Sequence, residues 1–207
     1  MADGGSLQGA VAGTGRTAVV FLHETGGQGM CGFATYAQWL AGHDHVQVLL
    51  VDRCGYGETA CKSAADSHDI RRETQPAVDW ARAHGARTVA LVGASSGGLD
   101  ALEAAATVHG ANSLVDISGD ENDTGANDLQ LARRVTVPAY FAVAPGDEYV
   151  SVAATRRFYN AVRSRVRRLD IEKGSPGVHG WDLLTTPAGR PSVLASEIAH
   201  WVLHPSR

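Results

Sequence analysis

The stretch Gly93-Ala94-Ser95-Ser96-Gly97-Gly98 constrains the fold most strongly. It follows an apolar run at residues 87–92 and precedes an alanine-rich helical pattern at 99–108. A serine at the tip of a tight strand-to-helix turn is crowded by the residues two positions before and after it, and glycine at both positions leaves room. The helix that begins beneath it directs free N–H groups and a positive dipole end toward a developing anion. The sequence therefore predicts a strand, a turn that presents Ser95, and a helix.

Strands and helices alternate along nearly the whole chain. Apolar, β-branched runs predict strands at residues 17–22, 45–51, 87–92, 112–117, 138–143 and 165–172, the last near a sheet edge. Helical spacing predicts helices at residues 33–40, 68–84, 99–108, 128–134, 151–164 and 191–203, with Pro76 kinking the second or marking a new start and Ser151 as an N-cap. This order predicts an α/β fold in three layers, with a mainly parallel sheet and helices on both faces.

Length and composition predict one domain. With 207 residues, 44% of them hydrophobic, the chain can bury one core. Residues 1–15 are expected to form a loose lead-in, with a short edge strand around residues 7–11. The net charge of −4 gives no reason to expect nucleic acid or an anionic membrane surface as a partner. No signal peptide or membrane-spanning run is apparent, so we expect a cytoplasmic location.

The three cysteines are Cys31, Cys54 and Cys61. An odd count without a secretion signal predicts reduced thiols. The alternative is a Cys54–Cys61 pair under oxidation, because the two lie seven residues apart in one loop. The sequence has no zinc-ligand spacing, and we expect neither a metal nor a cofactor.

Asp147 and His179 lie downstream of Ser95, and the chain order Ser, Asp, His is typical of nucleophilic catalysis. Asp147 follows the strand at 138–143, and His179 lies in the loop between the last strand and the last helix. A serine hydroxyl needs a base to take its proton, and histidine held by a carboxylate is the usual base. Taken singly, Asp147 reads equally well as an ordinary turn residue and His179 as a solvated loop histidine. Their order and their positions after strands favour the catalytic interpretation.

Other carboxylates compete with Asp147. Glu148 is adjacent but is expected to face away, and Asp123 lies in the loop after the preceding strand. Asp170 and Asp182 are close to His179 in sequence and are less suitable.

These motifs together resemble the α/β-hydrolase superfamily over nearly the whole chain. The matching features are the loop His23-Glu24-Thr25-Gly26-Gly27, the D-x-R-type loop at 52–59, the G-x-S-x-G-G turn, the A-x-x-D-x-x-V loop at 144–150, and His179-Gly-Trp-x-Leu-Leu. The resemblance implies Ser95 as nucleophile, His179 as base and Asp147 as acid. It also implies an oxyanion hole of two backbone N–H groups, one from Ser96 and one from the His23 loop.

Two positions depart from the family pattern. Glu24 stands where the family has a glycine, which leaves either Glu24 or Thr25 to supply the second N–H. We expect its carboxylate to face solvent; pointed inward, it would favour polar or cationic substrates. Cys54 interrupts the usual arginine–glycine pair of the second loop. We assign His23 and Trp181 to substrate contact.

Residues 118–137 are too few for the helical cap that many superfamily members carry, so we expect an open cleft with little or no cap. This suits small esters or acyl groups on a carrier. The leading hypothesis is a serine hydrolase that cleaves a carboxylic ester or thioester through an acyl-enzyme. The alternatives are acyl transfer or cyclisation (lactonisation) on the same triad, and a non-catalytic binding protein. A dinucleotide site is disfavoured because no early strand carries G-x-G-x-x-G. The oligomeric state is left open.

Overall fold

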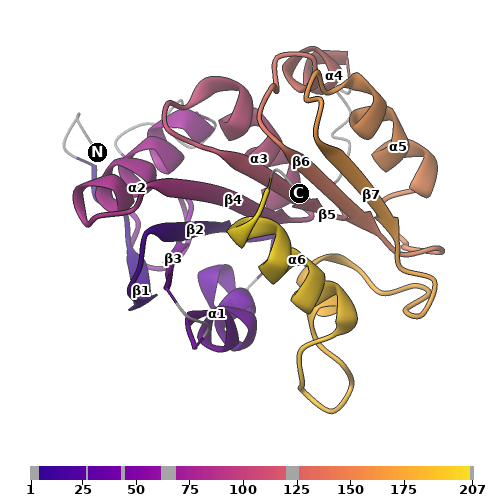
Figure 1. Ribbon diagram of the computed structural model, residues 1–207, viewed down its shortest axis with the longest axis horizontal. Helices are drawn as coiled ribbons and strands as arrows, with labels where there is room; N and C mark the ends of the chain where they lie inside the picture. Colours follow the sequence, from indigo (N-terminus) through magenta and orange to yellow (C-terminus); the bar gives the residue numbers. More distant parts are fainter. Residues whose placement is uncertain (1–4, 27, 43–44, 62–68, 120–125, 206–207) are drawn as a thin grey trace.

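The computed structural model describes residues 5–26, 28–42, 45–61, 69–119 and 126–205 (Figure 1). In chain order its elements are β1 (Gly9–Gly13), β2 (Thr17–Leu22), η1 (Gly29–Phe33), α1 (Ala34–Ala41), β3 (Val46–Val51), α2 (Ile70–Ala83), β4 (Thr88–Ala94), α3 (Ser96–Thr107), β5 (Ser113–Ile117), α4 (Ala126–Ala132), β6 (Ala139–Val143), α5 (Val152–Ala161), β7 (Arg167–Ile171), η3 (Gly180–Leu184) and α6 (Val193–Leu203). The predicted strands and helices are all present, with ends that differ by a few residues.

The strands form one sheet in the order β1-β3-β2-β4-β5-β6-β7. Neighbours from β3 to β7 run parallel. Among the described strands, β1 alone is antiparallel, pairing Gly9 with Val51 and Gly13 with Gln47. The short edge strand expected around residues 7–11 is therefore present, two residues further along the chain. The outer edge of β3 carries backbone groups that need partners, and β1 supplies them. At the other edge, β7 confirms the predicted edge strand.

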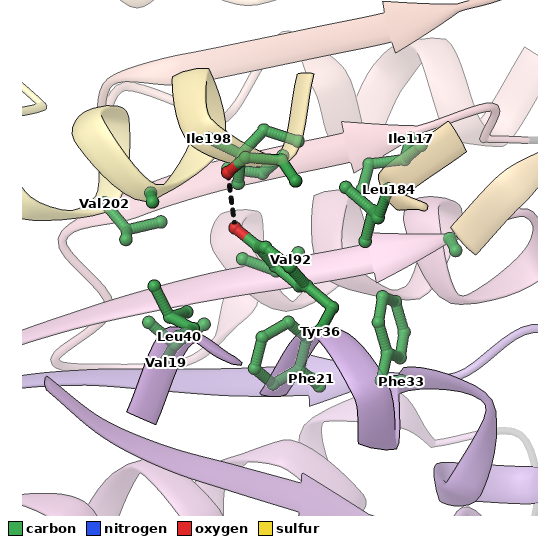
Figure 2. Packing of buried hydrophobic residues seen from close by; sticks show 14 of the residues in the cluster. Val19, Phe21, Phe33, Tyr36, Leu40, Val92, Ile117, Leu184, Ile198 and Val202 are labelled. Carbon is green, nitrogen blue, oxygen red and sulfur yellow. Dashed lines mark hydrogen bonds between the residues drawn. The ribbon is translucent and has the colours of Figure 1, made fainter. Parts of the chain in front are cut away.

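Helices cover both faces of the sheet (Figure 1). α1 and α6 pack on one face, and α2, α3, α4 and α5 pack on the other. Every side chain of β2 from Ala18 to Leu22 is apolar because helices cover both faces of the sheet. Val19 and Phe21 face α1 and α6, while Val20 and Leu22 face the helices on the opposite side. In Figure 2, the Tyr36 hydroxyl donates to the Ala195 carbonyl at 3.1 Å, which joins α1 to α6 inside the core.

Pro76 lies inside α2 without ending it. A proline at this position removes one backbone hydrogen bond. The buried side chains of Ala77, Val78 and Ala81 pack α2 onto the sheet, and this packing offsets the loss. The predicted cap at Ser151 is confirmed, because its Oγ accepts from the Ala154 N–H at 3.0 Å.

Between β5 and β6, the described part of the chain forms one helix, α4. It packs on α3 and α5 against the sheet. The described residues thus add no cap over the rim, while Asp123 lies outside them. Among the described helices, none combines the length and the apolar character that crossing a bilayer would require.

The parallel sheet brings the predicted site to one edge. His23 follows β2, Asp52 follows β3, Ser95 follows β4, and the loops with Asp147 and His179 follow β6 and β7. In parallel sheets of this kind, ligands bind beyond the carboxyl ends of the strands.

Candidate active site

Ser95 sits at a sharp turn between β4 and α3. Its backbone angles are φ 52° and ψ −125°, outside the regions that non-glycine residues prefer. The turn is held by the Ser95 N–H, which donates to the Ile117 carbonyl at 2.9 Å. A Cβ on Gly93 would overlap the Gly97 carbonyl, and one on Gly97 would overlap the Leu22 carbonyl. The spaced glycines are therefore a packing requirement of the turn.

We expect Gly97→Ala to lower the free energy of unfolding by about 3 kcal/mol or more, because backbone atoms cannot yield as a flexible side chain can. Urea unfolding followed by circular dichroism measures the change. Gly174→Ala is the matched control, since a Cβ there meets nothing within 4 Å. Equal stability of the two variants would contradict the packing account.

His179 and Asp147 form a hydrogen-bonded pair at the rim. His179 Nδ1 lies 2.9 Å from Asp147 Oδ1 and 2.8 Å from Oδ2. The Asp147 side chain is 0% exposed, and its Oδ1 also accepts from the N–H groups of Tyr149 at 2.9 Å and Val150 at 3.2 Å. These donors fix the carboxylate, which in turn holds the proton on Nδ1 and leaves Nε2 as the nitrogen that can accept one.

The competing carboxylates lie elsewhere. Asp170 accepts from the Tyr140 hydroxyl and from Arg168, while Glu148 and Asp182 are exposed. Among the described carboxylates, Asp147 is the one that hydrogen-bonds His179.

The histidine loop meets the serine turn through Gly180. A Cβ on Gly180 would lie 3.7 Å from the Ala94 Cβ, directly before Ser95. Within the described residues, no hydrogen bond joins Ser95 Oγ to His179 Nε2. Such catalytic hydrogen bonds commonly tighten only when substrate is bound.

Thr25 contacts Ser96, the residue directly after Ser95. The Thr25 and Ser96 hydroxyls are 2.8 Å apart, which places the loop after β2 beside the start of α3. Ser96 also accepts from Arg53 Nη2 at 3.2 Å. The loop and the helix are thus joined next to the serine turn.

His23 is a buried anchor beneath that loop. Its side chain is 0% exposed; Nδ1 donates to the Glu24 carbonyl at 2.8 Å and Nε2 accepts from the Arg53 N–H at 3.1 Å. Burial is the main cause that lowers the pKa of His23, with the Arg53 charge acting in the same direction. The assignment of His23 to substrate contact is therefore wrong, because the ring is covered and both nitrogens are occupied.

Glu24 points inward, and the expectation that it faces solvent is wrong. Its half-buried carboxylate accepts from the Trp181 N–H at 3.4 Å and lies where a side chain on Gly180 would be. Burial raises the pKa of Glu24, and Asp182 and Asp147 raise it further, against the opposing effects of the Trp181 N–H and His179. Glu24 thus ties the loop after β2 to the histidine loop.

Solved structures of other proteins share the fold of this chain. The Paleococcus ferrophilus monoacylglycerol lipase superposes with a TM-score of 0.76 at 16% identity, over 97% of this chain and 100% of that one. A Pyrococcus furiosus esterase gives 0.73 at 14% identity, over 97% and 91%. The enol-lactonase of Burkholderia xenovorans gives 0.71 at 13% identity, over 98% and 97%. This chain has the α/β-hydrolase fold. No family model and no curated protein matches its sequence.

Within this α/β-hydrolase fold, Trp181 in η3 packs against η1. Its ring packs edge-on to Phe33, with centroids 5.6 Å apart, and leaves no room for a side chain on Gly32. With Gln28, Thr35, Asp182 and Thr185 it lines a polar cavity of about 150 Å³. The structure shows Trp181 as a half-buried packing residue at this cavity, and its assignment to substrate contact remains a prediction.

Arg53 and Asp100 are residues of the site that the sequence patterns did not identify. Arg53 forms a close ion pair with Asp100 in α3, and its guanidinium lies 5.7 Å from the centre of the Tyr56 ring. Burial raises the pKa of Asp100, and the charge and hydrogen bond of Arg53 oppose that shift. The only available signal was the position of Arg53 in the D-x-R-type loop.

The expectation of reduced thiols is wrong for two of the three cysteines. Cys54 and Cys61 form a disulfide with Cα atoms 5.7 Å apart, within the usual range, while Cys31 is free and exposed. The loop after β3 folds back on itself, which brings the pair together. With Glu73 these sulfurs form the one described group of side chains spaced for a metal ion. In the disulfide neither sulfur is a thiolate, so the group offers no thiolate ligand.

Proposed function

We propose that the protein is a serine hydrolase that cleaves carboxylic esters through an acyl-enzyme. Ser95 Oγ attacks the carbonyl carbon, and His179 Nε2 takes its proton. His179 then returns the proton to the leaving alcohol, and water releases the acid by the same steps. Asp147 holds His179 in its productive tautomer and stabilises the imidazolium that forms. No cofactor is required for this chemistry.

One observation carries the proposal. A serine in a strained backbone conformation shares the rim of the sheet with a histidine whose Nδ1 is held by a buried carboxylate. These three residues come from separate loops after β4, β6 and β7. Strain at a serine between a strand and a helix is a property of nucleophile turns, since it exposes the hydroxyl.

The backbone N–H of Thr25 is better placed than that of Glu24 to be the second oxyanion donor. In a trans peptide the N–H points opposite to the preceding C=O. The Glu24 carbonyl accepts from the buried His23 ring, so the Thr25 N–H points away from that ring. The His23 carbonyl faces Gly97 in α3, which turns the Glu24 N–H away from the helix start. We assign the oxyanion hole to the backbone N–H groups of Ser96 and Thr25.

The similar structures support an ester as the bond that the protein cleaves. The similar structures are named for a lipase, esterases and a lactonase, and each name denotes an ester bond, open-chain or cyclic. The described residues place no cap over the rim, which favours small esters or acyl groups presented on a carrier, thioesters included. Glu24 adds negative charge near His179, so we expect anionic acyl groups to react poorly.

A fluorophosphonate probe tests the proposal directly. We expect it to attach to Ser95, identified by peptide mass spectrometry, and to compete with ester substrates. A panel of nitrophenyl esters, lactones and acyl thioesters of increasing chain length then defines the specificity. Folded protein that the probe does not label would favour a non-catalytic role, and labelling at another serine would refute Ser95 as the nucleophile.

A further inference from the structure

The disulfide Cys54–Cys61 closes the loop after β3 at the side of the proposed active site. Both cysteines are partly exposed, so a small thiol can reach them. The loop contains Gly55 and Gly57, and a disulfide removes much of the conformational freedom that such a segment would otherwise have. Breaking the bond therefore loosens the residues between the cysteines and those directly beside them.

A buried carboxyl group faces this pair. Glu73 in α2 is 3% exposed, and its oxygen and both sulfurs lie within 4.8 Å of one another. The Cys54 N–H donates to Glu73 Oε2 at 3.3 Å. Burial raises the pKa of Glu73 to about 7, and Asp100 and Asp69 also raise it, while the Cys54 N–H and Arg53 lower it. Glu73 can therefore give a proton to a departing thiolate or take one back near neutral pH.

Arg53 connects the disulfide to the site. It directly precedes Cys54, and its backbone N–H donates to His23 Nε2 at 3.1 Å. Its guanidinium contacts Asp100 and Ser96 Oγ, which lie one turn apart in α3. Through these contacts Arg53 touches the start of α3 and the anchor of the loop after β2, the two segments that carry the proposed oxyanion donors.

We propose that Cys54 and Cys61 are a redox-active pair served by Glu73, and that their oxidation state sets the rate of the Ser95 reaction through Arg53. Arg53 is a positioning residue in this scheme, because it acts on Ser96 and the His23 loop. The inference rests on the proposed hydrolase function for its readout, while the thiol–disulfide chemistry itself is independent of that function.

The reductant is an external dithiol. Its thiolate attacks one cysteine sulfur, the S–S bond breaks, and the other cysteine leaves as a thiolate that takes the proton of Glu73. The second thiol of the reductant loses its proton to Glu73 and attacks the mixed disulfide. The second cysteine leaves as a thiolate and takes from solvent the proton that the first reductant thiol released when it ionised. Two electrons pass from the dithiol, which becomes a cyclic disulfide, and the protein gains two thiols.

The first test compares kcat and KM of oxidised and reduced protein. Dithiothreitol is the reductant, oxidised glutathione restores the bond, and alkylation with mass spectrometry reports the state of each cysteine. We expect reduction to lower kcat about tenfold, with KM changed less than about twofold, and reoxidation to restore it. A structural disulfide alone would change stability and leave kcat of the folded protein unchanged. Equal kcat in both states overturns the inference, as does alkylation of both cysteines in protein never exposed to reductant.

Variants separate the parts of the scheme. We expect Cys54→Ser with Cys61→Ser to show the low kcat and no response to dithiothreitol, while Cys31→Ser responds like the wild type. Arg53→Met should have a low kcat that reduction does not lower further, and Arg53→Lys should recover part of it. If Arg53→Met and reduction each lowered kcat by its own factor, and the two factors multiplied in the reduced variant, the role of Arg53 would be overturned.

Glu73→Gln isolates the proton transfer. We expect it to slow reduction by dithiothreitol about tenfold or more at about pH 6, with kcat of the oxidised form unchanged. An unchanged reduction rate overturns the role of Glu73. Failure of the two proposals is distinguishable, because turnover retained by Ser95→Ala refutes the hydrolase mechanism, whereas turnover that needs Ser95 but ignores dithiothreitol refutes only the redox inference.

Discussion

Ser95→Ala should lower kcat for a short-chain ester by about 10³-fold or more, without loss of the fold. The hydroxyl is the proposed attacking group. Ser118 also has a positive φ directly after a parallel strand, but its side chain is buried. Steady-state kinetics with a nitrophenyl ester measure the effect, and circular dichroism confirms folding. This variant should also fail to react with the fluorophosphonate probe.

Ser96→Ala is the matched control for that experiment. Ser96 contributes its backbone N–H to the proposed oxyanion hole, and alanine keeps that group. The side chain loses its contacts with Thr25 and Arg53, so we expect kcat to fall by less than about tenfold. A larger effect at Ser96 than at Ser95 would reverse the proposed roles of the two serines.

Asp147→Asn also has a large expected effect, a fall in kcat of about 10⁴-fold. Both carboxylate oxygens lie within hydrogen-bond distance of His179 Nδ1. An asparagine amide presents a donor there, which favours the proton on Nε2 and leaves His179 unable to accept one from Ser95. The fold should persist, because the remaining amide oxygen can still accept from the N–H groups of Tyr149 and Val150.

Glu148→Gln controls for the loss of a negative charge in the same loop. Glu148 is adjacent in sequence but exposed, so we expect kcat within about twofold of the wild type. Comparable losses in the two variants would mean that local charge, and not the Asp147–His179 contact, controls the rate.

The sequence by itself was sufficient for the layers of the fold. Strands buried on both faces need continuous apolar runs, and amphipathic helices need their own period, so β2, β3 and α6 could be read directly. The position of Ser95 followed from local sterics, since only glycine fits two residues before and after it.

The loops required the tertiary structure. The direction of the Glu24 carboxylate depends on an N–H from Trp181, which lies more than 150 residues away and is invisible to local patterns. The burial of His23 depends on the loop after β3, and Arg53 gains its role only when α3 lies beside it. Such contacts are long-range, so neither spacing nor residue type indicates them.

The sequence therefore determined which segments form strands and helices, because periodicity and glycine sterics act within a few residues. Tertiary structure decided which side chains meet at the rim, because that depends on how loops from separate strands converge. The Cys54–Cys61 bond shows the difference most clearly. Their spacing permitted both free thiols and a disulfide, and only the fold of the loop around Glu73 brought the sulfurs together.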